Sequence, residues 1–176
     1  MLEDNGFRLD TGFLSIPYLL DVLCDNGFAD LARKVLLQEE CPSWLYEINN
    51  GATTIWESWA GIQPGGKVMN FSFNHYAFGC VGDFMVRKIA GLQVKEPGYK
   101  EFYIRPGLQF GVNEFELEYL SPQGLIKLSV KNNTLHIHVP AGSCAYITFA
   151  ELKEQLLTSG EYTFPIPVNN ASVLHS

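Results

Sequence analysis

The stretch Glu114-Phe-Glu-Leu-Glu-Tyr-Leu120 decides the fold of the second half of the chain. Polar and apolar residues alternate in it, so Phe115, Leu117 and Tyr119 share one face of an extended strand. Short runs of strand character flank it and are separated by turn residues. Strands at this spacing predict an antiparallel β-sandwich over residues 92–176. The flanking runs are residues 102–105, 125–130, 135–139, 145–149 and 162–166.

Residues 1–91 have a helical period instead. Apolar residues at helical spacing predict a helix that starts after Ser15, its N-cap, and ends at Asn26-Gly27. Further helices are expected over residues 28–39 and 75–90, and residues 44–59 are expected to be an irregular loop. Gly79 and Gly82 inside the third helix predict close packing there. Three helices leave apolar faces uncovered, which is typical of part of a helical barrel or bundle.

Composition excludes several classes of function. Of 176 residues, 47% are hydrophobic and 18% are charged, with a net charge of -7, so we expect a globular protein that does not bind nucleic acid. No apolar run is long enough for a membrane span, so no membrane partner is expected. The four cysteines lack CxxC spacing and are expected to be buried thiols rather than disulfides. His136 and His138 share a strand face without a carboxylate or cysteine pattern, so neither a metal nor a cofactor is expected.

One acid lies among aromatic residues in Gly51-Ala-Thr-Thr-Ile-Trp-Glu-Ser-Trp59. Glu57 stands between two tryptophans, and Asn74-His75-Tyr76 follows in similar company. Aromatic rings offer flat faces to pyranose C–H groups, and a carboxylate can move a proton, so the pattern indicates sugar hydrolysis. The alternative is a structural glutamate whose charge is satisfied by backbone N–H groups or an arginine.

These motifs resemble those of the bacterial α-L-rhamnosidases of glycoside hydrolase family 78. The resemblance covers roughly residues 8–150 and is specific because many motifs stand in the family's order. The chain has Ser58 where the family often has arginine, which puts the support of Glu57 in doubt. The matching stretches are Leu9-Asp-Thr-Gly-Phe-Leu14, Pro17-Tyr-Leu-Leu20, Pro42-Ser-Trp44, Gly51 to Glu57 with Trp59, Ser72-Phe-Asn-His-Tyr-Ala-Phe-Gly79, Val81-Gly82, Ile89-Ala-Gly91, Pro97-Gly-Tyr-Lys100 and Ile104-Arg-Pro106.

The resemblance implies an α+β fold: residues 1–91 are the last helices of an (α/α)6-barrel catalytic domain, and residues 92–176 are a C-terminal β-sandwich. It implies a fragment of an inverting enzyme that releases terminal α-L-rhamnose from rhamnosides. Glu57 matches the general base and His75 matches a rhamnose contact. The resemblance also implies that the catalytic acid lies outside these residues, so we expect the fragment to be inactive alone.

Several roles stay open at this point. Trp56 is a candidate substrate contact, but packing is the alternative for Trp56 and Trp59, and His75 can instead bond the backbone at a helix start. Asp10 is expected to cap or brace its loop. The β-sandwich can be a non-catalytic carbohydrate-binding module or a structural cap on the barrel, and uncovered barrel helices predict self-association. The sequence does not indicate a cellular location.

Overall fold

Residues 3–167 are described by a computed structural model, in which the chain forms two compact units, Met1–Phe84 and Met85–Ser176. The first unit is helical and the second consists mainly of strands, which confirms the predicted order of helices followed by a β-sandwich. The predicted domain boundary after residue 91 stays a prediction. No helix in the described part of the chain is both long and apolar enough to cross a membrane.

Two amphipathic helices form as predicted in the first unit. Helix α1 spans Ile16–Asp25 and helix α2 spans Ala29–Leu36, and each buries one apolar side. They pack against each other, and α1 also contacts α4, Cys80–Phe84. Ser15 occupies the predicted N-cap position of α1, but its side chain makes no capping hydrogen bond. The position of the cap is therefore confirmed, whereas Ser15 does not satisfy a backbone N–H of the helix with its hydroxyl.

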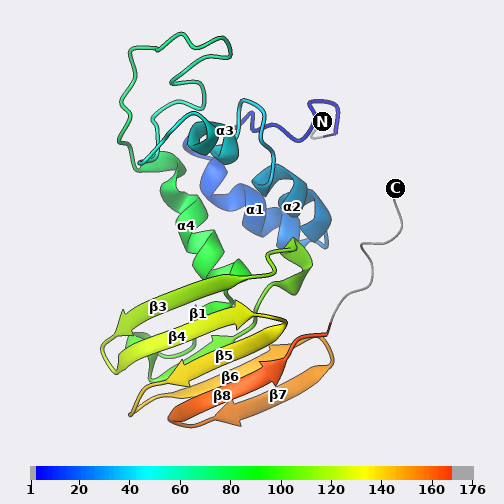
Figure 1. Cartoon of the computed structure of the whole chain (residues 1–176), viewed down its shortest axis with the longest axis vertical. Coiled ribbons are helices and arrows are strands. Elements are labelled where there is room, and N and C mark those ends of the chain that lie inside the picture. Colours follow the sequence, from blue (N-terminus) through cyan, green and yellow to red (C-terminus); the bar gives the residue numbers. More distant parts are fainter. Residues whose placement is uncertain (1–2, 168–176) are drawn as a thin grey trace. The chain divides into compact units, whose positions relative to one another are not determined.

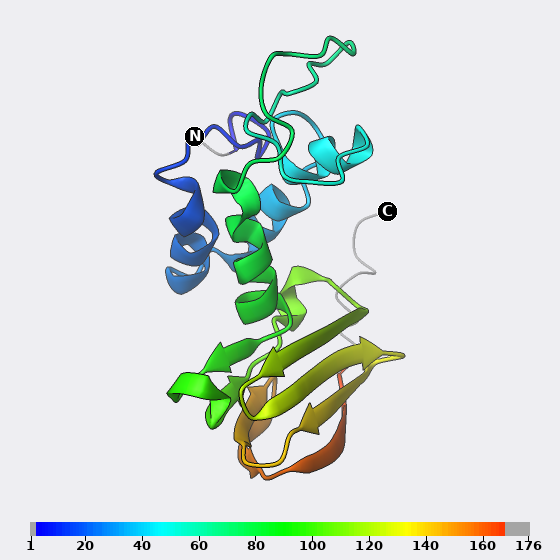
Figure 2. The ribbon, with the colours of Figure 1, turned by 90° about the vertical axis from the view of Figure 1, so that its left-hand side faces the viewer.

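A third short helix forms where an irregular loop was expected. Helix α3 spans Trp44–Asn49, and the Ser43 hydroxyl caps it by accepting a hydrogen bond from the Tyr46 N–H at 3.0 Å. The prediction of a loop was wrong here because six residues are too few to show a helical period. The chain from residue 50 to 76 is irregular, and Figure 2 shows it as the loop that follows α3.

The predicted helix over residues 75–90 forms as three successive segments. A 3₁₀ turn at Ala77–Gly79 leads into α4, which is followed by the π-helical turn η2 at Met85–Ile89. The close packing expected at Gly82 was wrong, because a Cβ there would meet no heavy atom of the described residues within 4 Å. At Gly79 a Cβ would make an ordinary contact with Ile55 at 3.8 Å.

Within the described residues the second unit contains two four-stranded sheets. One sheet has the order β1-β2-β6-β7 and the other β3-β4-β5-β8. All pairs are antiparallel except β2 with β6, so the predicted antiparallel sandwich contains one parallel pair. Two strands, β1 and β7, were not predicted. The strands are β1 Leu92–Val94, β2 Glu101–Ile104, β3 Phe115–Ser121, β4 Gly124–Lys131, β5 Thr134–Val139, β6 Cys144–Phe149, β7 Leu152–Leu157 and β8 Gly160–Pro165; the 3₁₀ turns are η3 Pro97–Tyr99 and η4 Leu108–Phe110.

The core of the second unit lies between these two sheets, with β3 and β4 nearer the viewer than β1 in Figure 1. Phe115, Leu117 and Tyr119 of β3 pack against this core, as their alternation predicted. Buried residues of both sheets contribute to it, which is how a sandwich covers the apolar face of each sheet. These buried side chains include Phe102, Ile104, Ile126, Leu128, Leu135, Ile137 and Ile147.

Candidate functional site

Two irregular segments of the first unit pair with each other and bring the predicted site residues together. The Glu57 N–H donates to the Ser72 carbonyl at 2.9 Å, and the His75 N–H donates to the Ile55 carbonyl at 2.8 Å. The Thr54 hydroxyl donates to the carbonyl of residue 73 as well. These bonds fix residues 54–57 against residues 72–75, so the backbones that carry Glu57 and His75 are held side by side.

The Glu57 side chain takes part in the same pairing. Its Oε2 accepts a hydrogen bond from the Ser72 N–H at 2.8 Å, and its Oε1 has no hydrogen-bond partner among residues 3–167. The side chain is half-buried. One carboxylate oxygen is therefore held in place, and the other is free to accept a hydrogen bond from a water or a ligand.

His75 stacks on two aromatic rings. Its ring lies 5.1 Å from that of Phe13 and 5.2 Å from that of Tyr76, with interplanar angles of 20° and 15°. Its Nδ1 accepts a hydrogen bond from the Ala77 N–H at 3.2 Å, as expected for a histidine at a helix start. A neutral ring with Nδ1 as acceptor carries its proton on Nε2, which leaves an N–H donor on the other edge.

Two of the tryptophans in this region form a packed cluster. The Trp59 ring stacks on Phe78 with centroids 3.7 Å apart and meets the edge of Trp44 at 5.3 Å. The Trp44 indole N–H donates to the Phe78 carbonyl at 2.9 Å, and that of Trp59 donates to the Thr11 carbonyl at 3.0 Å. With both indole donors satisfied inside the protein, the cluster supports the loop mechanically.

Trp56 lies inside the first unit. Its side chain is 2% exposed, and its ring meets the edge of Phe73 at 5.0 Å. A Cβ on Gly61 would come within 3.1 Å of the indole, so the loop passes close over the ring. A buried ring offers no open face to a sugar, and the packing alternative fits this placement of Trp56 better than substrate contact.

Glu47 was not singled out in the sequence, although it lies beside this loop. It is 2% exposed in the middle of α3, and its Oε2 accepts a hydrogen bond from the Trp56 N–H at 3.2 Å. Its Oε1 is buried and has no hydrogen-bond partner within residues 3–167. Desolvation by burial raises the pKa of this carboxyl to about 7, an effect that the hydrogen bond from Trp56 reduces.

The remaining sequence candidates lie elsewhere. Asp10 is exposed. His136 and His138 lie on β5, and His138 Nδ1 pairs with Glu161 of β8 at 2.5 Å. Among the described residues no group of three or more histidine, cysteine, aspartate or glutamate side chains could hold a metal ion. The four cysteines are free thiols, but each is only half-buried, so the prediction that they are buried was wrong.

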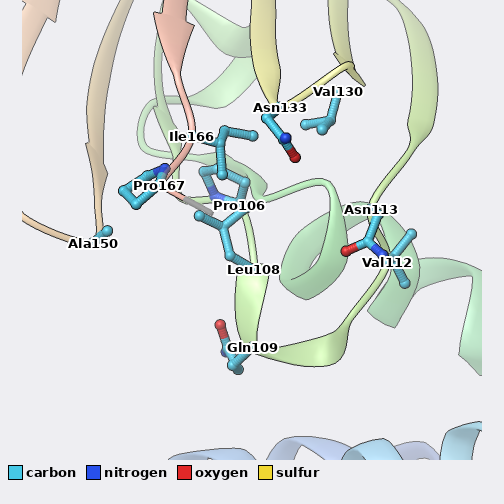
Figure 3. A pocket seen from close by; sticks show the side chains of 10 residues that line it. All are labelled: Pro106, Leu108, Gln109, Val112, Asn113, Val130, Asn133, Ala150, Ile166 and Pro167. Atoms are coloured by element: carbon cyan, nitrogen blue, oxygen red, sulfur yellow. The ribbon is translucent and has the colours of Figure 1, made fainter. Parts of the chain in front are cut away.

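The second unit has a pocket of its own with a volume of about 490 Å³. Pro106, Leu108 and Ile166 gather in it, and the side chains of Asn113 and Asn133 border it in Figure 3. None of the lining residues is charged, and three carboxamides can both donate and accept hydrogen bonds. This lining suits a neutral hydroxylated ligand. The lining residues are Pro106, Leu108, Gln109, Val112, Asn113, Val130, Asn133, Ala150, Ile166 and Pro167.

Comparison with curated proteins identifies relatives of both units. An alpha-L-rhamnosidase of Streptomyces avermitilis is 47% identical over 110 residues, which are 60% of this chain and 11% of that protein. An alpha-L-rhamnosidase of Formosa agariphila is 40% identical over 144 residues, 77% of this chain and 15% of that protein. The chain thus spans less than one sixth of the length of these two relatives.

Solved structures show the same likeness. The alpha-L-rhamnosidase of Aspergillus terreus superposes with a TM-score of 0.84 at 28% identity, covering 94% of this chain and 20% of that one. The Streptomyces avermitilis alpha-L-rhamnosidase, solved in complex with L-rhamnose, superposes with a TM-score of 0.82 at 32% identity, covering 94% of this chain and 19% of that one. Residues 1–89 match the bacterial alpha-L-rhamnosidase 6 hairpin glycosidase domain, and residues 91–164 match the bacterial alpha-L-rhamnosidase C-terminal domain. The chain belongs to the bacterial α-L-rhamnosidase family.

Proposed function

We propose that this chain supplies the general-base part of an inverting α-L-rhamnosidase active site, with Glu57 as the base and His75 as a rhamnose contact. The observation that carries the proposal is the state of the Glu57 carboxylate. One oxygen is held by the Ser72 N–H at 2.8 Å, and the other has no protein partner in the described part of the chain. A base in an inverting enzyme needs this combination of fixed position and an oxygen free to take a proton from water.

His75 supports the same proposal. Its ring is held by stacking on Phe13 and by the Ala77 N–H, so its Nε2 edge is pre-oriented as a hydrogen-bond donor to a sugar hydroxyl. We assign no substrate contact to the buried Trp56, and propose instead that its burial anchors the residue before Glu57.

The proposed reaction also needs an acid that protonates the leaving glycosidic oxygen. We infer from the family resemblance that this acid belongs to a part of the parent enzyme outside these residues, so the chain alone is expected to be inactive on rhamnose-containing glycosides. Tyr18 and Val22 of α1, and Leu14 just before it, expose large apolar side chains. This exposed apolar surface supports self-association of the isolated chain.

The proposal is tested by transplanting this chain into the Streptomyces avermitilis relative in place of the matching region. With an aryl α-L-rhamnoside, Glu57→Gln in that chimera should lower kcat by about 10²–10⁴-fold. Azide should restore release of the aryl group, because azide attacks the anomeric carbon without needing a base. The matched control is Glu151→Gln, an exposed acid in a turn of the second unit. Full activity of the Glu57→Gln chimera would rule out the base assignment.

A second candidate function rests on the pocket of the second unit, which supports a non-catalytic carbohydrate-binding role for the β-sandwich. Carboxamides beside apolar walls are suited to the hydroxyls and C–H faces of a neutral sugar. Titration of the ¹⁵N-labelled chain with L-rhamnose should shift the side-chain amide resonances of Asn113 and Asn133. If these resonances do not move at millimolar sugar while those near His75 do, the pocket has no such role.

A further inference from the structure

Glu47 contacts both ends of the loop that precedes Glu57. Its backbone carbonyl accepts hydrogen bonds from the Asn50 N–H at 3.1 Å and the Ala52 N–H at 3.0 Å. Its carboxylate accepts one from the Trp56 N–H at 3.2 Å. A single residue of α3 therefore fixes the start of the loop through its main chain and the end of the loop through its side chain.

We propose that Glu47 is a positioning residue that clamps residues 50–56 and thereby holds the Glu57 carboxylate against Ser72. Trp56 and Glu57 are consecutive, so the Trp56 N–H bond sets the direction in which the backbone enters Glu57. The Glu57 main chain and side chain then both bond to Ser72. The importance of this for catalysis rests on the proposed role of Glu57 as base.

A purely structural role would not require a carboxylate at this position. An acid with one partnered oxygen and one buried, unpartnered oxygen is costly to the fold, whereas an apolar residue of similar size would cost less. What the carboxylate adds is a charged acceptor for the Trp56 N–H, and hydrogen bonds to ionised acceptors are roughly twice as strong as neutral ones.

The strength of the clamp depends on the ionisation of Glu47. Burial places the pKa of Glu47 at about 7, so the clamp is charged above neutral pH and uncharged below it. Cys41 is a titratable neighbour, whose pKa is raised by burial and by the Glu47 charge and lowered by Arg8. Ionised Glu47 and a Cys41 thiolate disfavour each other, so Cys41 stays a thiol while Glu47 is charged.

Amide hydrogen exchange of the ¹⁵N-labelled chain tests the proposal without any need for activity. The Trp56 amide reports the clamp, and the Ser72 amide reports the position of Glu57. At pH 8, Glu47→Gln should speed exchange at both amides by about tenfold, the effect of weakening a charge-assisted hydrogen bond. Between pH 5 and 8 the Trp56 amide shift should titrate near pH 7 in the wild type and stay flat in Glu47→Gln. Glu39→Gln, at an exposed acid just after α2, is the matched control and should behave as the wild type.

Each outcome decides the proposal. Faster exchange confined to Trp56 and Ser72, with the pH titration lost, supports it. Unchanged exchange at Ser72 overturns it, as does a uniform increase across α1 and α2, which would mean that Glu47 only stabilises the first unit. Hydrogen exchange does not measure catalysis. If the assignment of Glu57 as the base is wrong, the chimera assay will show it, and the exchange result will be unaffected.

Discussion

Replacement of Glu47 by glutamine should stabilise the first unit at alkaline pH, although it loosens the loop before Glu57. The carboxyl is 2% exposed, and burial raises its pKa to about 7 from an ordinary value of 4.5. Since the pKa is higher in the folded state, the folded protein binds more protons than the unfolded chain between these two values. The stability contributed by neutral Glu47 is complete below pH 4.5 and is lost as pH rises through 7. Glutamine is isosteric and neutral at every pH, so it avoids this loss.

The size of the effect follows from the two pKa values. A pKa of about 7 against 4.5 corresponds to about 3 kcal/mol at about 1.4 kcal/mol for each pH unit. The free energies of unfolding of wild type and Glu47→Gln should therefore approach each other near pH 4 and diverge by about 3 kcal/mol by pH 8. Taking the difference between the two proteins cancels the titration of other groups, except for the interaction of Glu47 with Cys41. A Cys41→Ser background removes that interaction.

Urea unfolding followed by tryptophan fluorescence measures this difference directly, because Trp44, Trp56 and Trp59 are the three tryptophans of the chain and all lie in the first unit. Parallel stability curves for wild type and Glu47→Gln from pH 4 to 8 would refute the reasoning, since they would mean that Glu47 is not held neutral by burial. A gain in global stability at pH 8 together with faster exchange at Trp56 would separate positioning from stabilisation, because a structural residue moves both quantities in the same direction.

Three further changes, the first with a control substitution, have definite expected results. Gly91→Ala should destabilise the second unit by about 3 kcal/mol or more, measured by far-UV circular dichroism in urea, because a Cβ at this positive-φ residue would lie 2.2 Å from backbone atoms. Gly82→Ala is the control in open space, and should stabilise its helix by up to about 1 kcal/mol. Tyr18→Glu, on a side chain that is 67% exposed, should reduce concentration-dependent association in sedimentation velocity; an unchanged profile would mean that α1 is not the contact surface. Phe13→Leu should raise KM of the chimera about threefold to tenfold by removing one ring from the His75 stack, and an unchanged KM would mean that the stack does not orient His75.

The sequence predicts most of the fold because its periodic elements are long enough to show a period. Alternation predicts β3, and turn residues separate the runs that form β4 and β5, which pair as a hairpin. Strand β1 has three residues, too few for alternation to appear. Strand β7, Leu152–Leu157, has four consecutive exposed residues in its middle, so its burial does not follow the alternating pattern that a strand with one buried face shows. Its pairing with β6 is set by the neighbouring strand and by the turn at residue 150.

The candidate site, like the fold, could be predicted only in part. Glu57 and His75 belong to sequence motifs that the family resemblance identifies directly, whereas the residues that contact them are determined by the fold. Phe13 reaches His75 from a loop more than sixty residues earlier in the chain, and Ser72 meets Glu57 through backbone atoms that any residue could supply. Sequence patterns of side chains carry no information on such backbone contacts.

Glu47 was not predicted as a site residue because its environment is set by the tertiary structure and not by the local sequence. Within Trp44-Leu-Tyr-Glu-Ile48 a glutamate is unremarkable in the sequence, because acids are common on helices and usually face water. Only the burial of one side of α3, with Trp44 and Glu47, turns it into a carboxyl with an unpartnered oxygen, a conflict that a fold optimised for stability alone would remove. The conflict lies one hydrogen bond away from the residue before Glu57. Conflicts between local preference and tertiary environment concentrate at functional sites. The free-energy cost of burying Glu47 is therefore best explained by its role in positioning the loop before Glu57. For the same reason Glu47→Gln is expected to raise the global stability of the first unit while it speeds local amide exchange at Trp56.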